Sequence, residues 1–188
     1  LHITQFGPGA KRHRLTISGR DLRIRCFPEQ TPCATSRKNR LLSPDERLAV
    51  LRVPHGCEGS PTVAVRIKIP EGVIAVEPMP KPGWELATTS AKYGKTYDYY
   101  GTPLSEGVGE IAWTGGNLPD AWYDEFVFRA ALTDFPAGSS VYFPVVQECT
   151  DGKIERWIDI PAAGQSEDDL ETPAPGLTIT EKVKAGDD

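Results

Sequence analysis

Apolar and polar residues alternate along most of the chain after Leu48. Residues 63–69 (VAVRIKI) alternate strictly and stop at a proline, which is the pattern of a half-buried β-strand. No segment has the period of an amphipathic helix, and Gly and Pro separate the apolar runs. We interpret seven or eight short strands in this order as an antiparallel β-sandwich. The predicted strands are 48–53, 63–69, 73–76, 84–86, 108–113, 125–132, 141–147 and 154–160, and a last short strand is expected at 177–179 after an acidic loop.

Proline and tryptophan refine this prediction. Pro144 inside the run 141–147 indicates an edge strand or a bulge, because proline cannot donate to a strand ladder. Trp84 and Trp113 follow the alternation and are predicted to anchor the core, whereas Trp122 beside a Pro-Asp turn is predicted on the surface.

Charge divides the chain near residue 47. Residues 1–47 hold 10 Lys and Arg against 4 Asp and Glu, although the whole chain has a net charge of −5. We therefore predict three parts: a basic, poorly ordered segment at 1–47, a β domain at 48–180 and a frayed tail at 181–188. Binding of nucleic acid is not expected, since the β domain is acidic and would not continue a basic contact surface.

The cysteines and the hydropathy bear on the cell compartment. Cys57 and Cys149 each adjoin a predicted strand, so they are either a disulfide that closes a long loop or two buried thiols. No apolar run is long enough to predict a transmembrane segment, and no signal peptide is visible at the start of the given sequence.

Six short motifs stand out in the part of the chain from residue 48 to residue 177. They are VPHGCEGSPT (53–62), PKPGW (80–84), EIAWTGGNLPD (110–120), YDEFVF (123–128), YFPVVQEC (142–149) and RWIDIP (156–161). In this order they resemble the YcnI-like domain, a secreted or periplasmic bacterial family.

The resemblance implies an immunoglobulin-like β-sandwich that is exported and handles copper. In the family the mature chain begins with His, whose α-amine and imidazole bind Cu(II) together with a carboxylate, and a Trp lies close. Nitrogen and carboxylate oxygen ligands suit tetragonal Cu(II). Trp157 in RWIDIP matches the position of that Trp, and its alternative role is to pack on the sandwich.

The start of the chain departs from this pattern. The expected His-Val-Thr would lie about 20 residues before the VPHGC turn, where this chain has no histidine. His2, in Leu1-His2-Ile3-Thr4, imitates the opening but lies far from the turn and is not terminal. One hypothesis is that residues 1–47 are mistranslated, since a shifted reading frame permits His-Val-Thr near residue 34. We expect Cu(II) binding to be impaired in this chain because the terminal His is missing.

Two other residues are candidate metal ligands. His55 is the histidine of the β domain, and its alternative role is to hydrogen-bond within the Pro-His-Gly turn. Glu125 begins a predicted strand and is the carboxylate to test first, although most carboxylates in such a position are simply solvated. Asp124 and Glu125 are not expected to act as paired catalytic carboxylates, because neighbours on a strand point to opposite faces.

The function predicted from the sequence is a non-enzymatic, extracytoplasmic Cu(II) carrier or chaperone. Its expected partners are a membrane copper transporter or a factor that assembles copper enzymes. The alternatives are a cell-envelope module that binds a protein without metal and, third, a carbohydrate-binding sandwich that uses an exposed Trp.

Overall fold

The computed structural model describes residues 2–6 and 46–180, and the predictions for the rest of the 1–47 segment and for the 181–188 tail lie outside these residues. The described part is all-β apart from two single 3-10 turns, and it confirms the predicted fold class. The strands are β1 (His2–Phe6), β2 (Glu46–Val53), β3 (Thr62–Lys68), β4 (Val73–Pro78), β5 (Glu85–Tyr99), β6 (Thr102–Leu118), β7 (Asp124–Leu132), β8 (Ser140–Tyr142), β9 (Val145–Cys149), β10 (Ile154–Trp157) and β11 (Gly176–Thr178).

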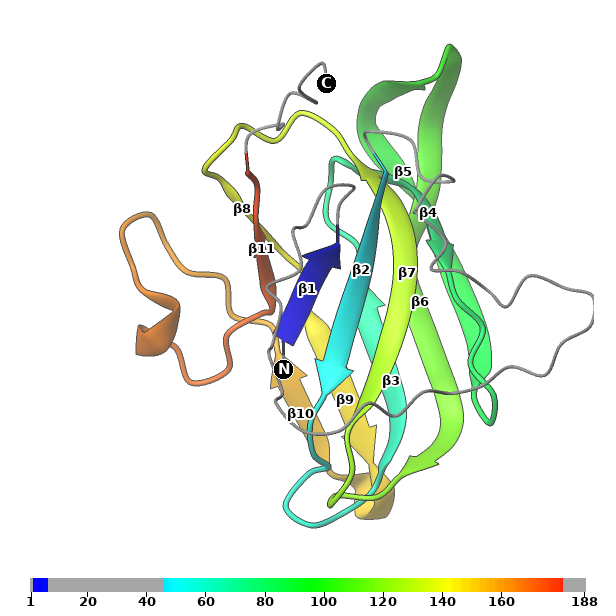
Figure 1. Cartoon of the computed structure of the whole chain (residues 1–188), viewed down its shortest axis with the longest axis vertical. Helices are drawn as coiled ribbons and strands as arrows, with labels where there is room; N and C mark the ends of the chain where they lie inside the picture. Colours follow the sequence, from blue (N-terminus) through cyan, green and yellow to red (C-terminus); the bar gives the residue numbers. More distant parts are fainter. Residues whose placement is uncertain (1, 7–45, 181–188) are drawn as a thin grey trace, which may run out of the picture.

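Two antiparallel sheets form the sandwich (Figure 1). One sheet has the order β1-β2-β7-β4, and the other has the order β10-β9-β3-β6-β5. A short third pair, β11-β8, lies beside them. In both sheets, strands distant in sequence are neighbours, as in other sandwiches with strand crossovers between the layers.

The core lies between the two sheets and is built from the alternating apolar positions. Trp113 on β6 and Phe126 on β7 are almost completely buried and lie 5.4 Å apart between ring centroids. Trp84 is half-buried and meets the ring of Phe126 edge-on at 4.9 Å. Both tryptophans therefore contribute to the core as predicted, and Trp122, which is 66% exposed, lies on the surface as predicted.

The disulfide alternative for Cys57 and Cys149 is confirmed. Their sulfurs are bonded, and the two residues are 92 positions apart in the sequence. Cys57 lies in the loop after β2, and Cys149 ends β9 in the opposite sheet. The bond therefore ties the loop between β2 and β3 to the end of β9.

The β5–β6 hairpin is much longer than the predicted strands 84–86 and 108–113. Residues 87–92 are all exposed, so both faces of β5 carry polar or small side chains and no alternation marks them as a strand. Towards its tip the hairpin is anchored by Tyr97, which is buried against Ile74 and Ala131 of the other sheet. The hydroxyl of Tyr97 donates a hydrogen bond to Glu71 at 2.7 Å.

Two further differences from the predicted strands have simple causes. The run 141–147 is not one strand: it is divided at Pro144, before which β8 pairs with β11 and after which β9 enters the five-stranded sheet. The run 154–160 is a strand only as far as Trp157, and the following Ile158 and Ile160 are exposed. The edge strand β1 was not predicted, and it pairs with β2 over its full length.

Candidate metal-binding site

Glu125 lies at the start of β7 and pairs with Arg52 on β2. The Nε atom of Arg52 donates to Oε1 of Glu125 at 2.8 Å, and the two residues are direct cross-strand neighbours. Leu51 and Val53 on either side of Arg52 are buried, so Arg52 points to the outer face of the sheet. The carboxylate predicted as a copper ligand is thus a surface group that forms an ion pair through one of its oxygens.

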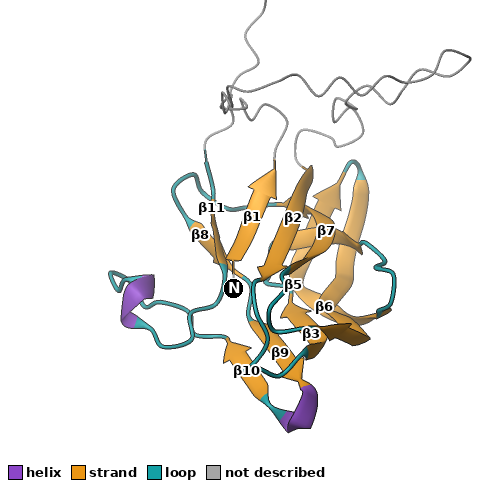
Figure 2. Ribbon diagram, turned by 60° about the horizontal axis from the view of Figure 1, so that its bottom comes forward, coloured by secondary structure: helices purple, strands orange, loops and turns teal. Residues whose placement is uncertain are grey.

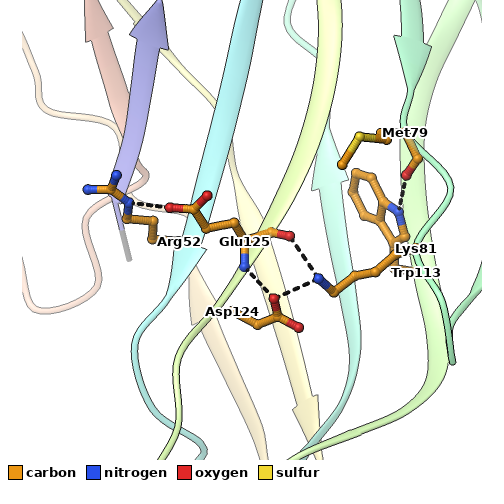
Figure 3. Close-up of polar contacts among 6 residues, drawn as sticks. All are labelled: Arg52, Met79, Lys81, Trp113, Asp124 and Glu125. Carbon is orange, nitrogen blue, oxygen red and sulfur yellow. Dashed lines mark hydrogen bonds and ion pairs between the residues drawn. The ribbon is translucent and has the colours of Figure 1, made fainter. Parts of the chain in front are cut away.

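The backbone of Glu125 is held by a second pair, Lys81 and Asp124. Lys81 Nζ donates to Asp124 Oδ1 at 2.6 Å and to the Glu125 carbonyl oxygen at 3.1 Å. The same Oδ1 atom accepts the Glu125 N–H at 2.8 Å. Figure 3 shows this arrangement, with the Glu125 side chain turned away from Lys81 and towards Arg52. Both backbone polar groups of Glu125 are therefore satisfied, and its position is fixed independently of Arg52.

Lys81 reaches Glu125 because the loop after β4 is itself fixed. Trp113 Nε1 donates to the Met79 carbonyl oxygen at 3.1 Å (Figure 3), and the Met79 N–H donates to the Val127 carbonyl oxygen at 2.8 Å. The ammonium of Lys81 also lies 5.2 Å from the ring centroid of Phe126, within the range of a cation–π contact. The loop that carries PKPGW thus continues the contact of β4 with β7 past Pro78.

The register of β1 places His2 in the same row as Arg52 and Glu125. His2 pairs with Arg52 on one side of β2, and Glu125 pairs with it on the other. In Figures 1 and 2 the start of β1 lies beside the end of β10, where Trp157 is found. The fold therefore places the backbone of His2 on the edge strand β1, two strands from Glu125 on β7, while Trp157 lies on the edge strand β10 of the other sheet.

Trp157 is half-buried on the edge strand β10 and packs against the main core. Its Nε1 atom is buried and meets no hydrogen-bond acceptor among the described residues. Packing on the sandwich, one of the two roles considered for this residue, is thus observed. A buried N–H group with no partner is unusual in a folded protein.

His55 is exposed and held within its own turn. Its Nδ1 atom lies 2.7 Å from the Gly56 carbonyl oxygen, which can only accept, so Nδ1 is the protonated nitrogen. The His55 carbonyl oxygen accepts from Gln147 Nε2 at 2.8 Å, and the Gly56 N–H donates to Asp120 Oδ1 at 2.9 Å. The turn role considered for His55 is therefore observed. Across the described ranges, no group of three or more His, Cys, Asp and Glu residues could hold a metal ion.

Sequence reasoning did not single out Arg52, Lys81 or the register of His2. The alternation within 48–53 does place Arg52 on the outer face, but only the long-range pairing of β2 with β7 brings it to Glu125. Lys81 lies in a phrase used for the resemblance, and its role depends on a loop that crosses to β7. Neither contact has a signal in local sequence.

The fold is that of an immunoglobulin-like sandwich, and one solved structure agrees with it. An uncharacterized protein from Nocardia farcinica, whose crystal structure was described as having an immunoglobulin-like fold, is 26% identical to this chain. The match has a TM-score of 0.52 and covers 72% of this chain and 89% of that one.

A family model described as "Domain of unknown function (DUF1775)" matches residues 43–179. The chain belongs to this family. A search of curated proteins found no match. No helix in the described part of the chain is long and apolar enough to cross a membrane.

Proposed function

We propose that this protein binds Cu(II) outside the cytoplasm and carries it to a membrane copper transporter or to a factor that assembles copper enzymes. The proposed site uses the α-amine and imidazole of His2, once His2 is the first residue, together with the Glu125 carboxylate. The observation that carries the proposal is the row His2–Arg52–Glu125 across β1, β2 and β7. It removes the objection that His2 is too distant in sequence from the domain.

The chemistry of these donors fits Cu(II). An amine and an imidazole from one residue close a chelate ring, and a carboxylate oxygen completes a nitrogen–oxygen set that favours Cu(II) over the other divalent first-row metals. Of the two carboxylate oxygens of Glu125, Oε1 accepts from Arg52. The proximity of β10 to the start of β1 supports Trp157 as the neighbouring indole (Figure 2).

The disulfide supports a location outside the cytoplasm. Bonds such as Cys57–Cys149 persist in oxidising compartments and are rare in the reducing cytosol. An exported precursor also supplies the means to expose a new first residue, because a signal peptidase cleaves the chain ahead of the mature N-terminus. The disulfide fits the secreted or periplasmic location that the resemblance implies.

A competition titration with Cu(II) tests this function. The protein beginning at His2 is compared with the same protein acetylated at its α-amine, which removes one ligand and leaves every side chain in place. We expect one tightly bound Cu(II) per chain for the first form and a loss of at least about tenfold in affinity for the second. Equal affinities, or no stoichiometric binding by the first form, would contradict the proposal.

A second candidate function is a cell-envelope module that binds a protein without metal. Trp122 and Tyr123, in the loop between β6 and β7, are 66% and 68% exposed, and adjacent exposed aromatic residues are common in protein interfaces. This candidate predicts that neither form of the protein binds Cu(II) stoichiometrically. The titration above therefore separates the two.

A further inference from the structure

Arg52 stands between the two groups to which the proposed copper site is assigned. On one side it is the cross-strand neighbour of His2, and on the other it is the neighbour of Glu125. Its Nε atom donates to Glu125 Oε1 at 2.8 Å, and in Figure 3 its guanidinium extends from β2 towards β1. A metal ion that joined His2 to Glu125 would therefore meet this cation.

We propose that Arg52 is the gate of the copper site: it holds the Glu125 carboxylate in the copper-free protein and is displaced when copper binds. This inference rests on the copper function proposed above. Arg52 acts as a displaceable counter-ion and is not itself a ligand, since a guanidinium has no lone pair to offer and does not lose its proton in proteins.

Arg52 and Cu(II) compete for the Glu125 carboxylate because both are cations. In the copper-free state the carboxylate pairs with the guanidinium of Arg52, and Cu(II) would bring a second, doubly charged cation to the same group. With the guanidinium still in place, the two positive centres would repel each other at short range. Copper binding and the Arg52–Glu125 contact therefore oppose each other, and copper must pull the carboxylate from Arg52 to bind with full affinity.

The exchange is easy because the ion pair is exposed. The side chains of Arg52 and Glu125 are 45% and 39% exposed, so the released guanidinium can be hydrated without moving the backbone. Exposed ion pairs of this kind are weak, which limits the effect of the gate on affinity to about fivefold. A modest gate of this size suits a carrier that must also release its metal.

The backbone of Glu125 does not depend on Arg52. Lys81 and Asp124 hold its carbonyl and its N–H, and these contacts lie on the side of Glu125 away from Arg52 (Figure 3). When Arg52 leaves, the carboxylate therefore stays in reach of β1. Lys81 therefore positions the backbone of Glu125, and Arg52 binds its side-chain carboxylate.

The variant Arg52→Met in the protein beginning at His2 tests the gate, with Arg129→Met as the matched control. Arg129 also forms an ion pair on the same sheet, with Glu77 at 2.7 Å, and its removal changes the net charge by the same amount. We expect Arg52→Met to bind Cu(II) about three- to fivefold more tightly than the parent at low ionic strength. Arg129→Met should remain within about twofold of the parent, and the gain from Arg52→Met should shrink at about 1 M salt because screening weakens the gate.

The outcomes separate the gate from the copper function itself. If the parent binds Cu(II) and Arg52→Met binds it equally or more weakly, the gate is wrong while the copper function stands. If the parent binds no Cu(II), both proposals fail. Arg52→Gln, which has a shorter, uncharged polar side chain, is a second variant in case Arg52→Met misfolds, and it should show the same gain. Unchanged affinity in a folded Arg52→Gln protein would overturn the gate as well.

Discussion

Lys81 Nζ lies 2.6 Å from Asp124 Oδ1, and this contact ties the loop after β4 to the start of β7. The side chain of Lys81 is only 18% exposed, and it also donates to the Glu125 carbonyl oxygen. Lys81 therefore contributes more than a surface ion pair. It also satisfies the Glu125 carbonyl oxygen at the start of β7, where β4 no longer pairs with this strand.

Replacing Lys81 should therefore destabilise the sandwich. We expect Lys81→Met to lower the free energy of unfolding by about 2 kcal/mol, because two charge-assisted hydrogen bonds are lost while the apolar stem is kept. The control is Lys95→Met, whose ion pair with Asp134 is more than half exposed and should contribute less than about 1 kcal/mol. Urea-induced unfolding measures both, and equal losses would show that Lys81 has no special role.

The disulfide should be a large part of the stability. The Cys57–Cys149 bond closes a loop of 92 residues, and the loss of that restraint on the unfolded chain corresponds to about 4 kcal/mol. The double variant Cys57→Ala/Cys149→Ala should show this loss in chemical unfolding under oxidising conditions. Adding reductant should weaken the native protein and leave the double variant unchanged; a native protein indifferent to reductant would contradict this.

The β5–β6 hairpin should loosen at high pH. Burial, together with the hydrogen bond to Glu71, raises the pKa of Tyr97 to about 12 from its usual 10.0. The folded state therefore keeps a proton that the unfolded state loses above about pH 10, so this contribution to stability is complete below pH 10 and is lost as the pH rises towards 12. The loss should be about 2 kcal/mol, less than the full linkage value because Glu71 is exposed.

Tyr97→Phe isolates this effect from other titrations. The stability difference between the native protein and Tyr97→Phe should be constant up to about pH 9 and then fall in favour of the variant. Free energies of unfolding at several pH values provide the measurement. A difference that does not change between about pH 9 and pH 12 would place the Tyr97 hydroxyl in water.

Trp157 should report on bound copper. Cu(II) quenches indole fluorescence at short range, and in Figures 1 and 2 the end of β10 lies near the start of β1, where the proposed site has His2. Trp157→Phe in the protein beginning at His2 should lose most of the Cu(II)-dependent quenching. Trp122→Phe is the control, since that exposed indole lies in the loop between β6 and β7 and its removal should leave the quenching intact.

Local sequence patterns predicted the strands that bury one face in the core and expose the other. Strands β3 and β7 alternate because one face packs in the core, and Trp113 could be placed in the core from the sequence. Most of β5 could not be predicted, because residues 87–92 are exposed on both faces and leave no alternation. Pro144 signalled an irregularity, but the change of sheet depends on where β11 lies.

The sequence suggested individual candidate residues of the site but not how they lie relative to one another. Glu125 and Trp157 could be chosen from their phrases, but the row that joins His2, Arg52 and Glu125 comes from pairings across β2. Such pairings depend on the register of a whole sheet, which one buried face determines and no single residue encodes. His2 was set aside because it is distant in sequence and is not terminal, and the pairing of β1 with β2 answers only the first of these reasons.

Electron paramagnetic resonance of the protein beginning at His2, loaded with one equivalent of Cu(II), tests whether copper binds to the His2 amine and imidazole. We expect a tetragonal Cu(II) spectrum with coupling to nitrogen, which is lost when the α-amine is acetylated and altered by Glu125→Gln. A spectrum of unbound Cu(II), or a nitrogen-coordinated spectrum that survives both acetylation and His2→Ala, would contradict the claim that copper binds at the start of β1.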